Sequence, residues 1–169
     1  MNTTNTGRGM IAVACIIGMF LLTMFFSGVE ERQHNPNQSP DTRRTDQFIE
    51  VNLERNRQGH YVTAGTINNQ PVEFLLDTGA TDVVIPGAVA DRLGLEKGMA
   101  SRAMTANGPV TVYATRVDEI SIGGIRLQDV RASINPAMSP PGILLGMSAL
   151  RHIEFNQKND SLTLRQYSS

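Results

Sequence analysis

FLLDTGATDVVIP, residues 74–86, is the stretch that decides the fold of this chain. Its first apolar run, Phe74 to Leu76, ends at Asp77, and a second apolar run begins at Val83. Short apolar runs rich in branched side chains and bounded by turn residues predict buried strands. A carboxylate between two such strands costs free energy unless it is hydrogen-bonded or serves a function. The position of Asp77 therefore calls for an explanation.

Two interpretations of Asp77 are open from these residues. In the first, Asp77 and Thr78 only bond to the nearby backbone, and Gly79 supplies the dihedral angles of an ordinary turn. In the second, the turn presents the Asp77 carboxylate for acid–base chemistry. Three residues taken alone favour the ordinary turn, so the choice depends on the rest of the chain.

The remainder of the domain alternates short apolar runs with turn signals. Pairs of Asn, Gly and Asp favour tight connections, and they occur at Asn68-Asn69, Asn107-Gly108, Gly123-Gly124 and Asn159-Asp160. Helical patterning is confined to residues 88–93, before Gly94, and to a short stretch near residues 147–151. We therefore expect a mainly β, barrel-like domain with strands near residues 48–53, 61–67, 72–76, 83–86, 117–122, 125–134, 153–155 and 162–164.

Three segments in order resemble parts of aspartic proteases. The Asp77-Thr78-Gly79 turn between apolar strands resembles their active-site loop, and Thr105 to Gly108 resembles the tip of a single flap hairpin. Residues 143–146, Ile-Leu-Leu-Gly, are similar to the segment that threads through the loop holding the active-site turn. Together with Gly59-His60-Tyr61, these segments most resemble bacterial retropepsin-like proteases with an N-terminal membrane helix. The resemblance extends from about residue 48 onward.

This resemblance implies a retropepsin-like half-domain with Asp77 as the catalytic residue. It further implies that Thr78 bonds across a dimer axis, that the Gly79 backbone meets substrate and that Ala80 and Thr81 pack behind them. The flap residues Thr105, Ala106, Asn107 and Gly108 would cover the cleft, although a plain solvent-exposed hairpin is the alternative for them. Residues 139–141 and 147–149 differ from the corresponding segments of viral members of this family. These differences bear on the dimer contact or the cleft wall.

The chemistry of peptide hydrolysis agrees with this implication. One carboxylate takes a proton from water while another, protonated, polarises the carbonyl, so two acids are needed. The chain has one Asp-Thr-Gly, and we therefore expect a homodimer that pairs two copies of Asp77 on a polypeptide substrate. Asp82, Asp91 and Asp129 lie in polar contexts and are expected to be surface charges.

Two other functions compete with that of an aspartic endopeptidase. The alternative on the same fold is a non-catalytic module that holds a peptide in its cleft by strand addition. A purely structural membrane protein is disfavoured, because an acid in such a turn costs stability without function. The intact Asp-Thr-Gly favours the enzyme.

The N-terminal region carries an apolar run without charges from Met10 to Phe26. We expect a transmembrane helix at residues 10–29, after a short tail at 1–9, followed by a flexible polar tether at 30–46 and the protease domain at 47–169. A cleaved signal peptide competes with the anchor, but Phe25 to Val29 lacks the small residues of a cleavage site. Too few apolar residues precede Cys15 for lipidation. The expected location is a bacterial inner membrane, with the domain on the periplasmic side.

The composition of the chain argues against several other classes of function. The formal net charge is -1 with charges of both signs interspersed, so a nucleic-acid partner is not expected. The single cysteine precludes an intrachain disulfide, and the three histidines are scattered. We therefore expect neither a metal nor another cofactor.

Overall fold

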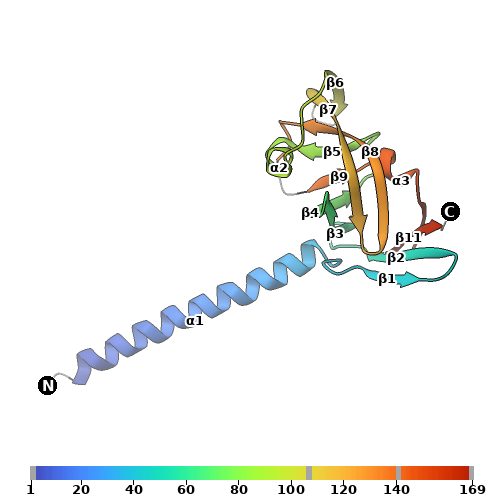
Figure 1. Ribbon diagram of the computed structural model, residues 1–169. Helices are drawn as coiled ribbons and strands as arrows, with labels where there is room; N and C mark the ends of the chain where they lie inside the picture. The colour runs from blue at the N-terminus through green and yellow to red at the C-terminus, as the bar shows by residue number, and fades with distance from the viewer. Residues whose placement is uncertain (1–2, 106–107, 140–141, 168–169) are drawn as a thin grey trace. The chain divides into compact units, whose positions relative to one another are not determined.

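The computed structural model describes residues 3–105, 108–139 and 142–167. The chain divides into two compact units, Met1–His34 and Asn35–Ser169. The first unit is the helix α1 (Thr3–His34), drawn in blue in Figure 1. Val13–His34 within it is long and apolar enough to cross a membrane, and its apolar side chains are exposed. A signal sequence near the N-terminus has the same properties.

The described residues of the second unit form two sheets and two short helices. The seven-stranded sheet has the order β3-β4-β9-β5-β8-β7-β6, and the four-stranded sheet has the order β1-β2-β11-β10. The strands of the larger sheet are β3 (Val62–Ile67), β4 (Gln70–Leu76), β5 (Val83–Pro86), β6 (Ala100–Thr105), β7 (Gly108–Ile122), β8 (Ile125–Asn135) and β9 (Ile143–Leu145). The helices are α2 (Gly87–Leu93) and α3 (Met147–Leu150).

The larger sheet closes on itself. β3 pairs with β4 along its length and also with β7 through Thr66↔Ser121 and Ile67↔Ile120, so six strands form a ring that β6 extends. A Cβ atom at Gly65 would collide with the carbonyl oxygen of Ser121, and this close approach at the closure requires glycine. The predicted mainly β, barrel-like fold is therefore confirmed.

The smaller sheet consists of antiparallel strands: β1 (Asp41–Arg44), β2 (Phe48–Glu54), β10 (Glu154–Lys158) and β11 (Ser161–Tyr167). Its inner face contributes Val51, Leu53, Leu162 and Leu164 to the core, all at most 6% exposed. Alternation in these strands places polar side chains on the outer face, where Arg165 pairs with Glu50 at 2.6 Å. Hydrogen bonds to Glu50 and Tyr167 raise the pKa of Arg165 above its ordinary value.

The structure corrects the expected flexible tether at residues 30–46. Asn35 and Asn37 are each 4% exposed, and β1 pairs with β2. The Asn37 amide donates to the Glu54 and Val62 carbonyl oxygens at 2.9 and 2.7 Å, and its oxygen accepts from the Glu54 N–H. Asparagine side chains thus join this polar segment to β2 and β3, so the lack of apolar residues does not leave it flexible.

Candidate active site

Asp77 lies in the turn between β4 and β5, and β9 holds both sides of that turn. β9 pairs in parallel with β4 and antiparallel with β5 through Val84↔Leu144. The Asp77 N–H donates to the carbonyl oxygen of Leu145 at 3.2 Å. The buried apolar runs predicted from the sequence therefore place this acid at one end of the barrel strands.

Inside the turn, the Asp77 carboxylate bonds to its own loop. Its Oδ1 atom accepts the Gly79 N–H at 2.9 Å, and the Ala80 N–H donates to the Asp77 carbonyl at 3.2 Å. Asp77 is half-buried, whereas Thr78 and Gly79 are exposed. One carboxylate edge is therefore held in place, while the apex of the turn is open to other molecules.

The segment after β9 braces the turn from the inside. The Met147 N–H donates to the Ala80 carbonyl at 2.8 Å, and the Ser148 N–H donates to the Thr81 carbonyl at 2.9 Å. A Cβ atom at Gly146 would collide with the carbonyl oxygen of Asp82 and lie 2.7 Å from that of Ala80. Only glycine lets the backbone at residue 146 pass this close to the turn. This explains the glycine in the motif at residues 143–146.

Ser148 is a site residue that sequence reasoning did not identify. It is 2% exposed, its Oγ accepts the Val83 N–H at 2.9 Å and the hydroxyl donates to the Arg131 carbonyl at 2.7 Å. The sequence marks residues 147–149 only as a departure from the viral members of the family. In the structure, its serine joins the Asp77 turn to β8.

Asp82, which we expect to be a surface charge, is partly exposed and forms an ion pair with Arg131. The Arg131 Nε and Nη2 atoms bond to its Oδ1 at 2.8 and 2.7 Å, and the side chains are 29% and 55% exposed for Asp82 and Arg131. This ion pair ties the second half of the turn to β8. Asp91 and Asp129 are exposed, as expected, and pair with Lys97 and Arg116.

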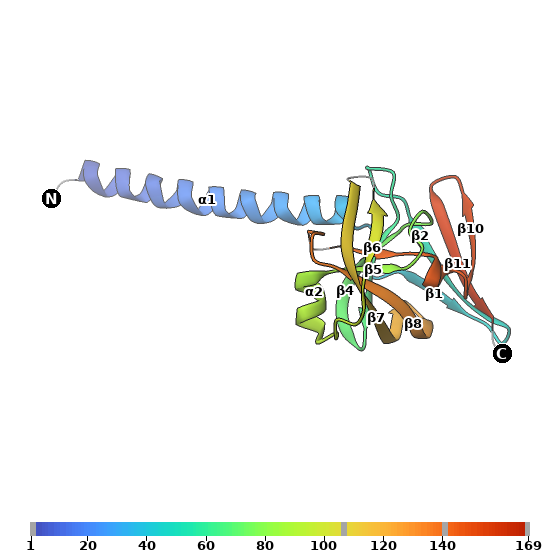
Figure 2. The ribbon, with the colours of Figure 1, turned by 90° about the horizontal axis from the view of Figure 1, so that it is seen from above.

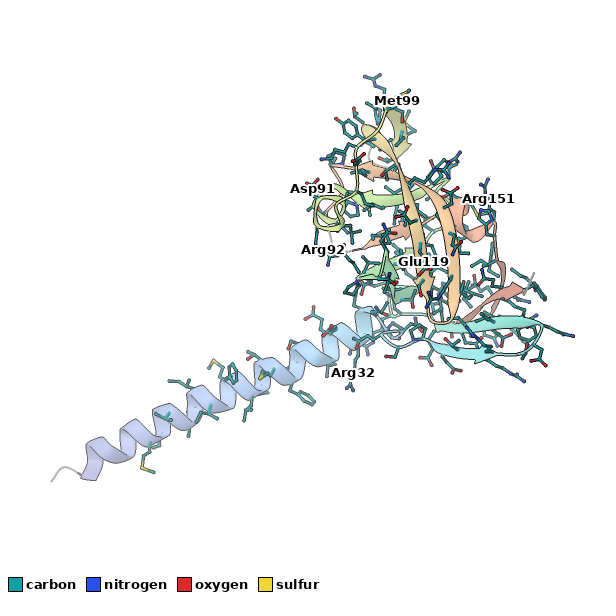
Figure 3. All side chains as sticks on the ribbon, viewed as in Figure 1. Arg32, Asp91, Arg92, Met99, Glu119 and Arg151 are labelled. Carbon is teal, nitrogen blue, oxygen red and sulfur yellow. The ribbon has the colours of Figure 1, made fainter. Side chains whose placement is uncertain are left out.

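The predicted flap coincides with the β6–β7 hairpin. Thr105 pairs with Gly108, and the Thr105 hydroxyl donates to the Gly108 carbonyl at 2.8 Å. Ala106 and Asn107, the rest of the predicted tip, lie outside the described residues. Met104 is 82% exposed, and Figure 3 shows the exposed Met99 beside β6 at the upper end of the domain. The role of this hairpin as a flap stays a prediction.

Other features of the described residues do not add to this site. They contain no cluster of three or more His, Cys, Asp or Glu side chains placed to hold a metal ion. A hollow of about 750 Å³ lies between the α2–β6 connection and β7, and the Asp77 turn does not line it. The candidate site is therefore the turn, its brace and the hairpin.

Comparisons with known proteins agree with this geometry. A family model described as a gag-polyprotein putative aspartyl protease matches residues 63–152. The crystal structure of a retropepsin-like aspartic protease from Rickettsia conorii covers 77% of this chain and 97% of its own, with a TM-score of 0.63 and 27% identity.

Two sequence relatives are uncharacterized proteins. One, in the cobV 5′ region of a Sinorhizobium species, is 32% identical over 120 residues, 69% of this chain and 52% of its own. The other, from Rickettsia prowazekii (strain Madrid E), is 26% identical over 121 residues, 70% of this chain and 52% of its own. The chain thus spans about half the length of these relatives. The fold, the braced Asp-Thr-Gly turn and the family match together show that the chain belongs to the gag-polyprotein aspartyl protease family and has the retropepsin-like fold.

Proposed function

We propose that this protein is an aspartic endopeptidase in which two copies of Asp77 activate one water molecule. The observation that carries the proposal is a half-buried carboxylate in a rigidly braced turn whose apex, Thr78 and Gly79, is exposed. Because the chain has one such turn, the second carboxylate comes from another copy across a two-fold axis.

The chemical step uses the two carboxyl groups in different protonation states. Two carboxylates that share a site cannot both ionise easily, and aspartic proteases are the general example of this proton sharing. The ionised group takes a proton from water as the water oxygen bonds to the peptide carbonyl carbon. The protonated group donates its proton toward the carbonyl oxygen. The tetrahedral intermediate then collapses: the group that took the proton from water gives it to the nitrogen, the other carboxylate takes back a hydroxyl proton, and the C–N bond breaks.

Other parts of the chain have supporting roles in this proposal. Thr78 bonds across the dimer axis, the Gly79 backbone meets the substrate and the β6–β7 hairpin covers the cleft, as in the family that the chain resembles. The helix α1 holds the domain at a bacterial inner membrane, with the domain on the periplasmic side. The exposed apolar surface of α1 supports an anchor in lipid.

The test compares the full chain in detergent with its Asp77→Asn variant on a diverse peptide library. Asn is nearly isosteric, so the fold should survive while cleavage is abolished. Asp91→Asn, which changes an exposed acid of α2, is the matched control and should cleave like the wild type. A statine-like inhibitor, which mimics the tetrahedral intermediate, should block wild-type cleavage. Wild-type cleavage by Asp77→Asn would overturn the proposal.

A further inference from the structure

The residues that follow helix α1 are bonded into the domain from the first one onward. Figure 2 shows α1 as one unbroken helix, and it ends at His34. Asn35 comes next, is 4% exposed, and its side-chain amide donates to the Glu73 carboxylate of β4 at 3.0 Å. The Asn35 side-chain oxygen also accepts the Asn37 N–H at 2.9 Å. The chain therefore enters the domain as soon as the helix ends.

This entry point lies close to the strands that lead to the Asp77 turn. The Asn37 carbonyl oxygen accepts the Ala64 N–H at 3.0 Å, and the Asn37 backbone forms a bridge with Thr63 of β3. Thr63 pairs with Phe74 of β4, and Asp77 follows Phe74 by three residues. Because neighbouring strands lie about 5 Å apart and a strand rises about 3.3 Å per residue, Asp77 lies within about 20 Å of Asn37.

The attachment at Asn37 is fixed because its side chain uses its bonding groups inside the domain. The amide nitrogen donates to the Glu54 and Val62 carbonyl oxygens, and the side-chain oxygen accepts the Glu54 N–H. Asn37 is 4% exposed, so releasing it would leave buried polar groups without partners, which costs free energy. The length of chain between helix α1 and the domain is therefore set by the fold.

This short route limits how far Asp77 lies from the membrane in which α1 is proposed to sit. The polar end of α1, residues 30–34, rises by only about 8 Å as a helix. The step from the helix end to Asn37 spans at most about 10 Å. Asp77 is then at most about 40 Å from the end of the apolar run, whatever the orientation of the domain. A flexible tether at residues 30–46 would by itself have spanned about 60 Å.

A site this close to a bilayer favours polypeptides that are held in the same bilayer. Two proteins anchored in one membrane have their outer segments confined to one thin layer, which raises the effective concentration of each for the other. An extended chain covers 40 Å in about 12 residues. Peptide bonds within roughly a dozen residues of a substrate's own membrane span therefore reach Asp77, whereas bonds that a rigid segment holds much farther out do not.

We propose that the substrates of this protein are membrane-anchored polypeptides, which it cleaves in the segment next to their membrane span. This inference rests on the proposed function, that is, on peptide cleavage at Asp77 and on α1 as an anchor, and it names the substrate class of that site. The distance of a peptide bond from the bilayer then selects the cleavage site, in addition to the sequence around the bond.

The test places the full chain in lipid vesicles together with transmembrane peptides as substrates. Each peptide carries one cleavable sequence, chosen from the library that tests the proposed function. In one peptide this sequence lies next to the span, and in the other a rigid helical spacer of about 40 residues moves it about 60 Å outward. The near site should be cleaved at least about 10-fold faster than the far site. The same sequence as a free peptide measures the activity without an anchor.

An insertion in the enzyme tests whether the short connection causes this preference. A flexible Gly/Ser segment of about 30 residues between Arg32 and Gln33 leaves the bonds of Asn35 and Asn37 in place. Cleavage of the far site should then rise toward that of the near site, and cleavage of the free peptide should stay unchanged. The matched control carries the same segment ahead of Met1 and should keep the wild-type preference. Equal cleavage of near and far sites by the wild type would overturn the proposal.

A fluorescence measurement tests the position of the site without any cleavage. In a Cys15→Ser background, Thr81→Cys carries a donor dye on an exposed residue of the Asp77 turn, and acceptor dyes lie on the lipid headgroups. Energy transfer should be strong and should fall when the Gly/Ser segment is inserted after Arg32. Weak transfer that the insertion does not change would overturn the proposal. If transfer follows the expected pattern but the free peptide is not cleaved, the position at the membrane stands and the proposed protease activity fails.

Discussion

The Asp77 turn and the β6–β7 hairpin are held in different ways. The turn receives hydrogen bonds from β9 and α3, and the Arg131 side chain of β8 bonds to Asp82 within it. The hairpin is held at its β6 edge only by pairing with β7, and its β6 side chains are almost all exposed. Elements with few buried contacts open at low free-energy cost. The comparison therefore contrasts a turn that several elements hold with a hairpin that has few buried contacts.

The difference also separates two kinds of sequence change. Substitutions in the brace should alter folding and activity together, because they displace the carboxylate. Substitutions on the exposed side of the hairpin should alter substrate binding with little effect on stability.

Gly146→Ala should have the largest effect, because its Cβ atom would collide with the Asp82 carbonyl oxygen. We expect a loss of about 3 kcal/mol in the free energy of unfolding, with loss of peptide cleavage. Gly142→Ala is the matched control, since a Cβ atom there meets no atom within 4 Å. Denaturant unfolding of both variants measures the difference in their free energies of unfolding. Equal stabilities would show that the backbone at Gly146 has room for a Cβ atom.

Ser148→Ala should destabilise the domain by about 2 kcal/mol, because the buried Val83 N–H and Arg131 carbonyl both lose a partner. Peptide cleavage should fall mainly through kcat. The exposed Ser101 is the control, and its change to alanine should alter stability by no more than about 0.5 kcal/mol. If Ser148→Ala is as stable as Ser101→Ala, the hydrogen bonds of Ser148 do not stabilise the turn.

Asp82→Asn should cost about 0.5 to 1 kcal/mol, because solvent screens the partly exposed ion pair with Arg131. A double-mutant cycle with Arg131→Gln, measured at low and high salt, isolates the interaction. The pair of Lys97 and Asp91, at 42% and 67% exposure, is the comparison and should show weaker coupling. Coupling energies in the reverse order would contradict a bracing role for Asp82.

Met104→Ser should have the smallest effect on stability, within about 0.5 kcal/mol, because the side chain is 82% exposed. If the hairpin covers substrate, KM should rise while kcat changes little. Thermal unfolding and steady-state kinetics on one peptide substrate test both parts. A large fall in Tm would mean that this hairpin is packed rather than free.

Several features of the fold and site could be predicted from local patterns. Alternating apolar residues, turn-forming pairs and the helix stop at Gly94 predicted most of the strands and both short helices of the domain, but not β1 or β6. The Asp-Thr-Gly turn between apolar runs identified Asp77, because an acid in that setting is uncommon. The roles of the predicted site residues, Asp77 among them, stay predictions.

Local patterns did not predict the buried polar segment before β1, and the reason is physical. Asn35 and Asn37 belong to a polar segment that reads as a tether, yet their side chains bond to distant strands. A reading based on apolar periodicity detects burial of apolar faces and does not detect polar groups buried through hydrogen bonds.

The sequence by itself determined the mainly β fold, the apolar N-terminal helix and the single Asp-Thr-Gly turn, because each depends on residues close together in the chain. Only the tertiary structure decided how that turn is held. Ser148 and Val83 are 65 positions apart and Arg131 and Asp82 are 49 apart, and neither pair has a local signature. It also decided that β10 rather than the C-terminal β11 forms an open edge, because strand order in a sheet depends on which segments pair after the chain has folded.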